Sequence, residues 1–404
     1  VASVKTPANK TRLIPFEFST EQTYILEFGN LYIRFYKDNS SIYEGDKTIT
    51  AITKANPGVI TCSSHGYLSG DEILITSIVG MTELNNQRFL VVKIDANTFS
   101  LTNTAGVAIN TTNFTTYGSA GTMNRVYEIT TPYTTAQLFD IKFAQSADVM
   151  YITHPNHQTR KLSRTDHTSW SLAAVEFTNG PFLDSNITET TLTPGSHGVG
   201  TGVSVTASAV TGINGGSGFL TTDVGRQIRI GVGYGIITAR TNTTVVTITI
   251  TTAIANSNAN ADWSLGSFST TTGFPSCVSF FEQRLVFAAS INNPQTVYFS
   301  KSGDYENMDA NIGGTVADDD AIIYTIASNQ VNAIRFLTSA RTLIIGTAGG
   351  EFVVSGGGDN NAVTPTNIMI KKQSNHGAAN VDAISVGNAT LFLQRAKRKI
   401  RELA

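Results

Sequence analysis

Short apolar runs separated by polar turns recur through the C-terminal part of this chain, and they follow one plan. In residues 278–299 (VSFFEQRLVFAASINNPQTVYF), an apolar run and a polar turn precede Leu285-Val286-Phe287, and a second turn leads to Val297-Tyr298-Phe299. The same order recurs in residues 333–354 and 383–403. Apolar runs this short, bounded by Gly, Asn and Ser, are typical of strands rather than helices. The pattern therefore predicts a succession of β-hairpins.

Two earlier stretches repeat this plan. Residues 23–28 (TYILEF) and 31–36 (LYIRFY) flank Gly29-Asn30, and Gly-Asn between two alternating runs is a signal for a tight hairpin. Residues 138–163 hold a further unit, which Trp170-Ser171-Leu172 would complete as a last strand. The chain thus contains five units, whose second strands are centred near Ile25, Val149, Leu285, Leu343 and Leu391.

The spacing of these second strands indicates the architecture. Leu285 and Leu343 are 58 residues apart, and Leu343 and Leu391 are 48 apart, near the roughly 40–50 residues of a propeller blade. The two earlier intervals are 124 and 136 residues long, which leaves a surplus of roughly 75–85 residues in each. Each interval contains a Thr-, Gly- and Asn-rich segment of about that size, and surface connections tolerate such insertions.

We therefore predict an all-β fold: a β-propeller interrupted between its hairpin units by two inserted small β-barrel or sandwich domains. The predicted regions are residues 1–46 (first part of the propeller), 47–125 (first insert), 126–185 (propeller continued), 186–268 (second insert) and 269–404 (propeller continued). The clearest strands of the inserts are 59–61, 72–75, 88–94 and 98–102 in the first, and 227–230 and 244–251 in the second. Because the chain stops inside a strand pattern, we expect the last region to be incomplete and the chain to be a portion of a longer polypeptide.

Composition narrows the range of functions. Charged residues make up 14% of the chain, below the roughly 25% of an average soluble protein, and the formal net charge is −2. Tight non-specific binding to nucleic acid needs a basic surface, so we do not expect it. Cys62 and Cys277 form no CxxC or zinc-binding pattern, and both are expected to be small buried apolar residues. No apolar run approaches the ~18 residues of a membrane helix, so no membrane-spanning segment is predicted.

Candidate catalytic and metal-binding groups are few. Asp318-Asp319-Asp320, with Asp304, Glu306 and Asp309 upstream, could form a calcium loop or an acid–base pair, but consecutive aspartates rarely converge on one ion. A solvated loop is the simpler interpretation, and the turn after these aspartates is the best place for a helix. His154 and His157 have no third ligand nearby, which favours an exposed turn over a metal site. No GxSxG or HExxH motif occurs, and Gly356-Gly357-Gly358 lacks the Lys-Ser/Thr of a phosphate loop. We therefore predict no enzymatic activity, no cofactor and no metal.

One local cluster of charge stands out near the end of the chain. It consists of Arg395, Lys397, Arg398, Lys399 and Arg401, and Lys371 and Lys372 precede it. In a chain so poor in charge, this basic patch could face phosphates or an acidic partner, in a lumen or at an interface. The alternative is a hairpin tip with solvent-facing cations, which would also protect an exposed strand edge.

Several of these stretches together are similar to those of a known family. The chain resembles the tail nozzle, or tail tubular protein B, family of short-tailed bacteriophages. The residues that carry the resemblance are 13–28 (LIPFEFSTEQTYILEF), 274–287 (FPSCVSFFEQRLVF), 294–307 (PQTVYFSKSGDYEN), 318–334 (DDDAIIYTIASNQVNAI), 343–351 (LIIGTAGGE) and 386–403 (VGNATLFLQRAKRKIREL).

The resemblance implies a structural protein of the virion tail. It implies a homo-hexamer that extends the tail below the adaptor protein, conducts double-stranded DNA during ejection and anchors tail fibres or spikes. Low charge suits a lumen through which DNA must slide.

The first insert carries a separate resemblance. Ser64-His65-Gly66, Gly70-Asp71-Glu72, the stretch 80–85 (GMTELN) and Thr98-Phe99-Ser100-Leu101 resemble the small β-barrel named after the first catalytic-cysteine half-domain of ubiquitin-activating enzymes. This resemblance implies a binding-type barrel without ubiquitin chemistry, and it gives Cys62 no catalytic role.

A second functional hypothesis is a carbohydrate-binding or depolymerising phage tail or surface β-protein. In that case exposed aromatic residues of the inserts, such as Phe114, Tyr117 and Tyr234, would stack on sugars. A pair of carboxylates roughly 5–9.5 Å apart in a groove beside them would favour the depolymerase. A propeller scaffold of the eukaryotic type would carry WD or kelch signatures, which the sequence lacks.

Overall fold

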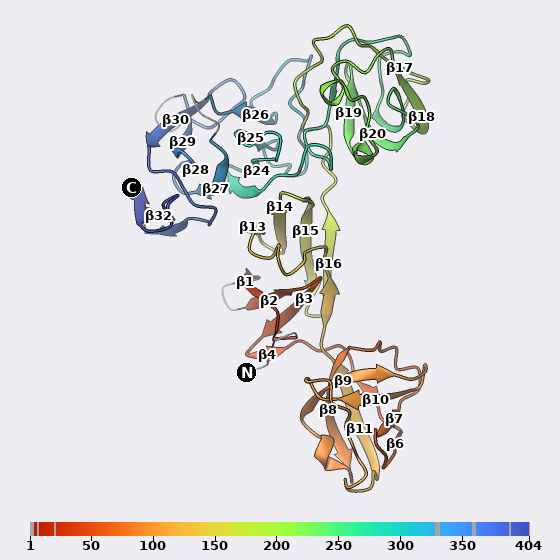
Figure 1. Ribbon diagram of the computed structural model, residues 1–404. Helices are drawn as coiled ribbons and strands as arrows, with labels where there is room; N and C mark the ends of the chain where they lie inside the picture. Colours follow the sequence, from red (N-terminus) through yellow and green to blue (C-terminus); the bar gives the residue numbers. More distant parts are fainter. Residues whose placement is uncertain are drawn as a thin grey trace. The chain divides into compact units, whose positions relative to one another are not determined.

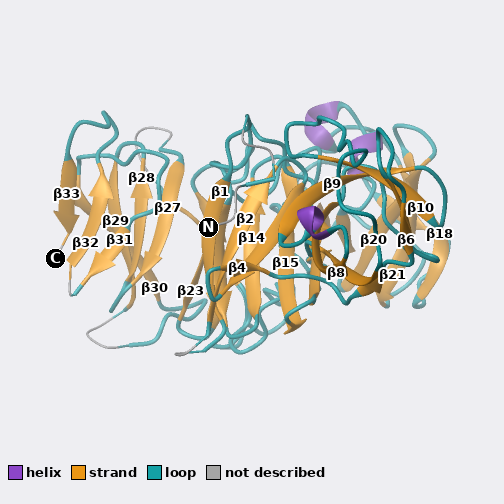
Figure 2. Cartoon of the chain, turned by 90° about the horizontal axis from the view of Figure 1, so that it is seen from below, coloured by secondary structure: helices purple, strands orange, loops and turns teal. Residues whose placement is uncertain are grey.

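The computed structural model describes residues 4–5, 8–19, 22–327, 332–357, 361–387 and 389–403. Strands dominate this part of the chain, and its helical elements are three short 3-10 turns, η1 (Thr82–Leu84), η2 (Asn214–Gly216) and η3 (Thr221–Asp223) (Figures 1 and 2). The prediction of an all-β fold is confirmed. Gly358 of the triple-glycine stretch and Ala404 at the end of the last predicted region lie outside the described residues.

The chain divides into two compact units. Unit 1 comprises residues 1–139 and 163–172, and unit 2 comprises residues 140–162 and 173–404. Strands β15 (His157–Asp166) and β16 (Ser169–Ala174) run from one unit into the other.

The first sheet of unit 1 contains the predicted tight hairpin. Its strand order is β1-β2-β3-β12, with β4 paired to β3. The facing pairs Phe28–Ile33 and Gly29–Tyr32 confirm the hairpin around Gly29-Asn30. On one side of the sheet Phe35 stacks on Trp170 at 4.4 Å between ring centroids. The bounds are β1 (Arg12–Glu17), β2 (Thr23–Gly29), β3 (Tyr32–Lys37), β4 (Ser40–Ser41) and β12 (Glu128–Thr130).

The segment between β4 and β12 forms a sheet of its own. The seven strands have the order β5-β11-β8-β9-β10-β7-β6 and enclose an apolar core that includes Ile75, Met81, Phe89 and Phe99. The strands predicted at 59–61, 72–75, 88–94 and 98–102 are confirmed. The bounds are β5 (Lys47–Thr48), β6 (Ala51–Ile52), β7 (Val59–Thr61), β8 (Glu72–Val79), β9 (Gln87–Lys93), β10 (Thr98–Thr102) and β11 (Ser119–Arg125).

The position of this insert differs from the expectation in one respect. We expected it between two hairpin units, but β12 lies after the insert and pairs with β3 through Glu128–Arg34 and Ile129–Ile33. The insert therefore interrupts the first sheet itself. The short Glu128–Thr130 strand has no distinct hydrophobic period, which is why the pattern did not reveal it.

Four antiparallel sheets have strands that pair in chain order; the last three lie in unit 2, and the first shares β15 and β16 with unit 1. They are β13-β14-β15-β16, β23-β24-β25-β26, β27-β28-β29-β30 and β31-β32-β33. The predicted second strands near Val149, Leu285, Leu343 and Leu391 are β14, β24, β28 and β32, each of them second in its sheet. The bounds are β13 (Lys142–Ser146), β14 (Val149–His154), β23 (Cys277–Phe281), β24 (Arg284–Ala288), β25 (Thr296–Phe299), β26 (Ile322–Thr325), β27 (Ile334–Ser339), β28 (Leu343–Thr347), β29 (Gly350–Gly356), β30 (Ile368–Ser374), β31 (Ile384–Val386), β32 (Ala389–Leu393) and β33 (Ile400–Leu403).

Successive sheets of unit 2 share apolar cores. One core joins Val286 and Phe299 of the second of these sheets to Ile345 and Phe352 of the third. The first strand β23 adjoins both β13 and β27. At this place the buried Lys142 donates to the carbonyl oxygen of Arg335 and forms an ion pair of 2.9 Å with Asp382. No helix follows Asp320, because β26 begins at Ile322.

The second insert, in unit 2, is a six-stranded sheet between β16 and β23. Its order is β17-β18-β21-β20-β19-β22, and its core includes Phe219, Ile237, Ile248 and Trp263. The strands predicted at 227–230 and 244–251 are confirmed as β19 and β21. The bounds are β17 (Leu192–Pro194), β18 (Gly200–Ala207), β19 (Gln227–Ile230), β20 (Gly233–Arg240), β21 (Val245–Thr252) and β22 (Trp263–Leu265).

Candidate functional site

The turn that joins β32 to β33 gathers the predicted basic residues. The Gln394 amide donates to the Lys399 carbonyl at 2.9 Å, and Lys397 lies in the left-handed region with a φ of 56°. Arg395, Lys397, Arg398 and Lys399 are exposed. Within the described part of the chain, none of these four cations forms an ion pair. The turn is therefore a compact group of unneutralised positive charge.

The remaining predicted cations have other surroundings. Arg401 on β33 is half-buried, and its Nε donates to Gln394 Oε1 at 3.3 Å. Lys371 and Lys372 lie on β30 of the neighbouring sheet, where Lys372 Nζ is 5.9 Å from the Phe352 ring centroid. Four of the seven cations therefore lie together on the turn at 394–399, and the other three lie on strands.

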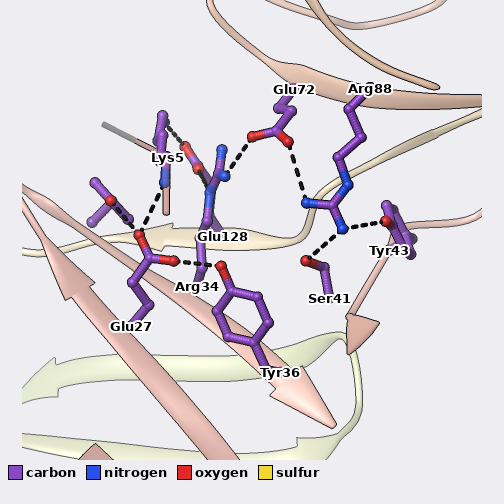
Figure 3. Close-up of polar contacts among 10 residues, drawn as sticks. Lys5, Glu27, Arg34, Tyr36, Ser41, Tyr43, Glu72, Arg88 and Glu128 are labelled. Carbon is purple, nitrogen blue, oxygen red and sulfur yellow. Dashed lines mark hydrogen bonds and ion pairs between the residues drawn. The ribbon is translucent and has the colours of Figure 1, made fainter. Parts of the chain in front are cut away.

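A second polar cluster lies within unit 1, where the first sheet meets its insert (Figure 3). Arg34 on β3 is 1% exposed and forms ion pairs of 2.6 Å with Glu72 on β8 and 3.0 Å with Glu128 on β12. Burial by itself would lower the pKa of Arg34, but the two carboxylates outweigh it and raise that pKa. Arg88 Nη1 lies 3.3 Å from the other oxygen of Glu72. The cluster therefore joins the sheet to the insert by charge-assisted hydrogen bonds.

Glu27 on β2 extends this cluster. It is fully buried and accepts hydrogen bonds from the hydroxyls of Tyr32 and Tyr36 and from the Lys5 amide. Burial and the hydrogen bond to Glu27 raise the pKa of both tyrosines, so they remain donors. Lys5 Nζ also lies 2.5 Å from Glu128. With its charges paired and its hydroxyls engaged, this cluster is suited to fixing the insert rather than to chemistry on a substrate.

Sequence reasoning missed this cluster. Its members come from five strands, β2, β3, β8, β9 and β12, and from Lys5 before the first strand, so no single motif reveals them. One local signal was available: Arg34 is a lone charge inside the apolar run 31–36, and such a charge must be paired if the strand is buried on both faces.

The acidic loop between β25 and β26 is only partly solvated. Asp318 and Asp319 are exposed, as predicted, but Asp320 is 3% exposed and forms an ion pair of 2.7 Å with Lys301. Burial opposes ionisation of Asp320, but the Ala317 amide and Lys301 lower its pKa below the ordinary value. The buried Arg284 donates to the carbonyl oxygens of Asp318 and Asp320, each at 2.7 Å, and so fixes the loop backbone.

The histidine pair differs from the exposed turn that we predicted. His154 is 2% exposed, its ring centroid lies 4.9 Å from that of His157, and burial lowers its pKa to about 4. A buried strand end, rather than an open turn, holds His154, because β14 continues to this residue. No group of three metal-ligating side chains occurs among the described residues.

The three aromatic residues named for sugar stacking are not exposed. Tyr234 is 7% exposed, stacks on Phe182 at 5.5 Å and donates to Asp309 at 3.1 Å. Phe114 and Tyr117 are half-buried against the core of the first insert. The expectation of exposed stacking platforms at these positions was wrong, because each ring completes an apolar core. As expected, Cys62 and Cys277 are free and buried.

No helix in the described part of the chain is long and apolar enough to cross a membrane.

Comparisons with known proteins concern mainly the first insert. The family model of the ubiquitin-activating enzyme E1 FCCH domain matches residues 55–127. Ubiquitin-like modifier-activating enzyme 1 of Oryctolagus cuniculus is 32% identical over 108 residues, and that of Homo sapiens is 31% identical over 108 residues. Each alignment covers 24% of this chain and 10% of the relative, so the chain spans about a tenth of the length of these curated relatives.

The chain also has matches among solved structures, one of which is a phage enzyme. The phage phi92 endosialidase is 10% identical, with coverage of 98% of this chain and 76% of that chain, and the TM-score is 0.16. A TM-score this low carries no argument about fold or function.

Proposed function

We propose that this chain is a tail nozzle protein of a short-tailed bacteriophage, a structural protein of the virion tail rather than an enzyme. In this proposal six copies form a tube below the adaptor protein. The tube conducts double-stranded DNA during ejection and provides attachment for tail fibres or spikes.

The proposal rests on the positions of the family-like stretches in the fold. Residues 13–28 cover β1 and most of β2, residues 274–287 cover β23 and most of β24, and residues 343–351 cover β28. These strands build the sheets whose strands pair in chain order, so the resemblance follows the repeated architecture and not a single motif. The inserts lie outside these stretches.

We further propose that these antiparallel sheets are the blades of a β-propeller. A propeller blade is a four-stranded antiparallel meander whose first strand lies nearest the axis. Three of these sheets are such meanders, and the first strand β23, which adjoins both β13 and β27, supports an axis at that place. Lys142, which reaches Arg335 and Asp382 there, supports a closed axis rather than an open channel. In the proposed tube, each propeller is therefore part of the wall, and the lumen lies between copies.

The alternative, a carbohydrate-binding or depolymerising tail protein, gains no specific support. It depended on exposed aromatic residues, and Phe114, Tyr117 and Tyr234 are packed into cores. The first insert is similar to a domain of a ubiquitin-activating enzyme, and we propose that here it serves as a binding module without that chemistry.

Electron microscopy of the purified protein, alone and with its adaptor, tests the proposal. We expect sixfold rings with an open channel that attach to the adaptor. A strict monomer that degrades capsular polysaccharide would contradict it and favour the alternative.

A further inference from the structure

A cavity of about 410 Å³ lies in unit 2, between the second insert and the segments that follow it. Its lining comes from residues 183–188, from the region of η2 and η3, from β22, and from the loops that hold Thr271 and Asn292. Strands β27 to β33 contribute no residue to the lining within the described part of the chain. The volume lies in the roughly 300–1,000 Å³ range of small-molecule sites. The cavity is therefore large enough for a small ligand.

Arg226, in the wall of this cavity, carries a hydrogen-bond donor that the protein does not use. The side chain is 0% exposed, and its Nε donates to the Gly266 carbonyl oxygen at 2.8 Å. Its Nη1 donates to Asn214 Oδ1 at 2.8 Å and to Asp223 Oδ1 at 2.9 Å. Nη2 is buried and has no hydrogen-bond partner among the described residues. A buried donor on a charged group is costly to leave unpaired, so Nη2 calls for an acceptor that a ligand could supply.

Asp223 cannot supply that acceptor. Its Oδ1 accepts from Arg226 Nη1 and from Thr271 Oγ1 at 2.7 Å. Its Oδ2 accepts from the Leu220 amide at 2.8 Å and from Asn214 Nδ2 at 2.7 Å. Two carboxylate oxygens offer about four acceptor positions, so all of them are in use. These hydrogen bonds also hold the guanidinium in one orientation, which lowers the cost of ordering it around a ligand.

The charge of Arg226 is incompletely compensated within the chain. Burial lowers the pKa of Arg226 below its ordinary value, although Asp223 raises it. The similarly buried Arg34 of unit 1 has two carboxylate partners, and its pKa is raised instead. A second anionic group at Arg226 Nη2 would therefore be favourable.

The same cavity presents a carboxylate without a cation. Asp184 is exposed on the lining and forms no ion pair within the part of the chain that the structure describes. Leu183, Leu220 and Leu265 add apolar surface to the lining. Asp184 would repel a simple anion, and a simple cation would leave Nη2 unsatisfied. A molecule that carries both charges and an apolar group meets all three features.

We propose that this cavity binds a free α-amino acid. The ligand carboxylate accepts hydrogen bonds from Arg226 Nη2, the ligand ammonium group faces Asp184, and the ligand side chain packs on the leucines of the lining. A neutral sugar of similar size would bring no charge to either residue and would form weaker hydrogen bonds. The site goes beyond the proposed assembly and does not rest on it.

Isothermal titration calorimetry of the full chain with each of the common α-amino acids tests the proposal. We expect at least one of them to bind with a dissociation constant of about 1 mM or lower. Conversion of the carboxylate of that amino acid to an amide should weaken binding roughly tenfold or more, and so should acetylation of its amino group, because each removes one charge-assisted contact.

Variants assign each end of the ligand to one residue. Asp184→Asn should weaken binding of the amino acid and remove most of the penalty for acetylation, while the penalty for the amide remains. Arg226→Met should show the reverse pattern. Glu189→Gln is the matched control and should change neither, because Glu189 is exposed in the same segment but does not line the cavity. Circular dichroism checks the fold, and if Arg226→Met fails to fold, Asp184→Asn and the two ligand analogues still decide the matter.

Three results would overturn the proposal. If no common amino acid binds at about 10 mM, ordered water is the partner of Arg226 Nη2. If the amino acid binds equally well to the wild type and to Asp184→Asn, or if both analogues bind as well as the parent, the ligand lies elsewhere. Binding of neutral sugars in place of amino acids would assign the cavity to another class of ligand. None of these results bears on ring formation, which electron microscopy measures separately.

Discussion

The buried ion cluster of unit 1 should make Arg34 unusually important for stability. We expect Arg34→Met to lower the free energy of unfolding of unit 1 by roughly 3–5 kcal/mol, the cost typical of breaking a buried pair by removal of one partner. The reason is that Glu72, 4% exposed, would keep only its 3.3 Å contact with Arg88. Removal of the guanidinium also leaves Glu128 without its buried partner.

Arg125 provides the matched control in the same unit. It too pairs with two carboxylates, Glu44 at 2.8 Å and Asp71 at 2.9 Å, but its side chain is 30% exposed instead of 1%. Water screens such pairs, so Arg125→Met should cost about 1 kcal/mol or less for each pair. The comparison isolates burial, because the substitution and the number of partners are the same.

Tryptophan fluorescence during urea unfolding measures the effect. The chain has two tryptophans, Trp170 in unit 1 and Trp263 in the second insert, so a Trp263→Phe background leaves Trp170 as the reporter. With a urea dependence of about 2 kcal/mol per molar, Arg34→Met should move the midpoint down by about 1.5–2.5 M. If its midpoint shifts no more than that of Arg125→Met, the argument from burial is refuted.

Three other changes test further parts of the structure. Lys142→Met should cost unit 2 about 1 kcal/mol or less in the same denaturation assay, because its partner Asp382 is 44% exposed and stays solvated once the lysine is removed. Burial lowers the pKa of His154 to about 4 in the folded protein, against an ordinary value near 6.5, so the unfolded chain binds the proton more readily. The contribution of His154 to the free energy of unfolding should therefore be complete above pH 6.5 and fall by up to about 3 kcal/mol as the pH drops toward 4. His154→Phe should flatten that pH profile of the unfolding midpoint. Replacement of residues 47–125 by a short linker should leave a cooperatively folding β-protein by circular dichroism, and loss of all cooperative unfolding would contradict an insert at those boundaries.

The strands were predictable from sequence because their signals are local. The runs 23–28 and 31–36 around Gly29-Asn30 fix one hairpin, and the second strands near Val149, Leu285, Leu343 and Leu391 follow from short apolar runs between turn residues. Such patterns can be recognised without knowing which distant residues the strand contacts in the fold.

The polar interior was not predictable in the same way. Arg34 and Glu72 form an ion pair only because the fold brings β3 and β8 together. The spacing of the two residues in the sequence does not predict that pair. The burial of Tyr234 and His154 likewise depends on neighbouring side chains rather than on the local pattern. The basic turn at 394–399 was located from sequence because four of its six residues are cations.

The interrupted first sheet has a consequence for the order in which the chain folds. β3 can gain β12 as its neighbour only after the intervening residues have been made, and closing an unstructured loop of about 90 residues costs about 4 kcal/mol of chain entropy. The insert removes most of that cost once it has folded, because its first strand β5 pairs with its last strand β11 through Thr48–Thr122 and Lys47–Met123. Its two ends therefore leave side by side, and the Tyr43–Val126 bridge continues the pairing toward the sheet. An insert that has already folded would therefore bring β12 beside β3 at little further cost in chain entropy.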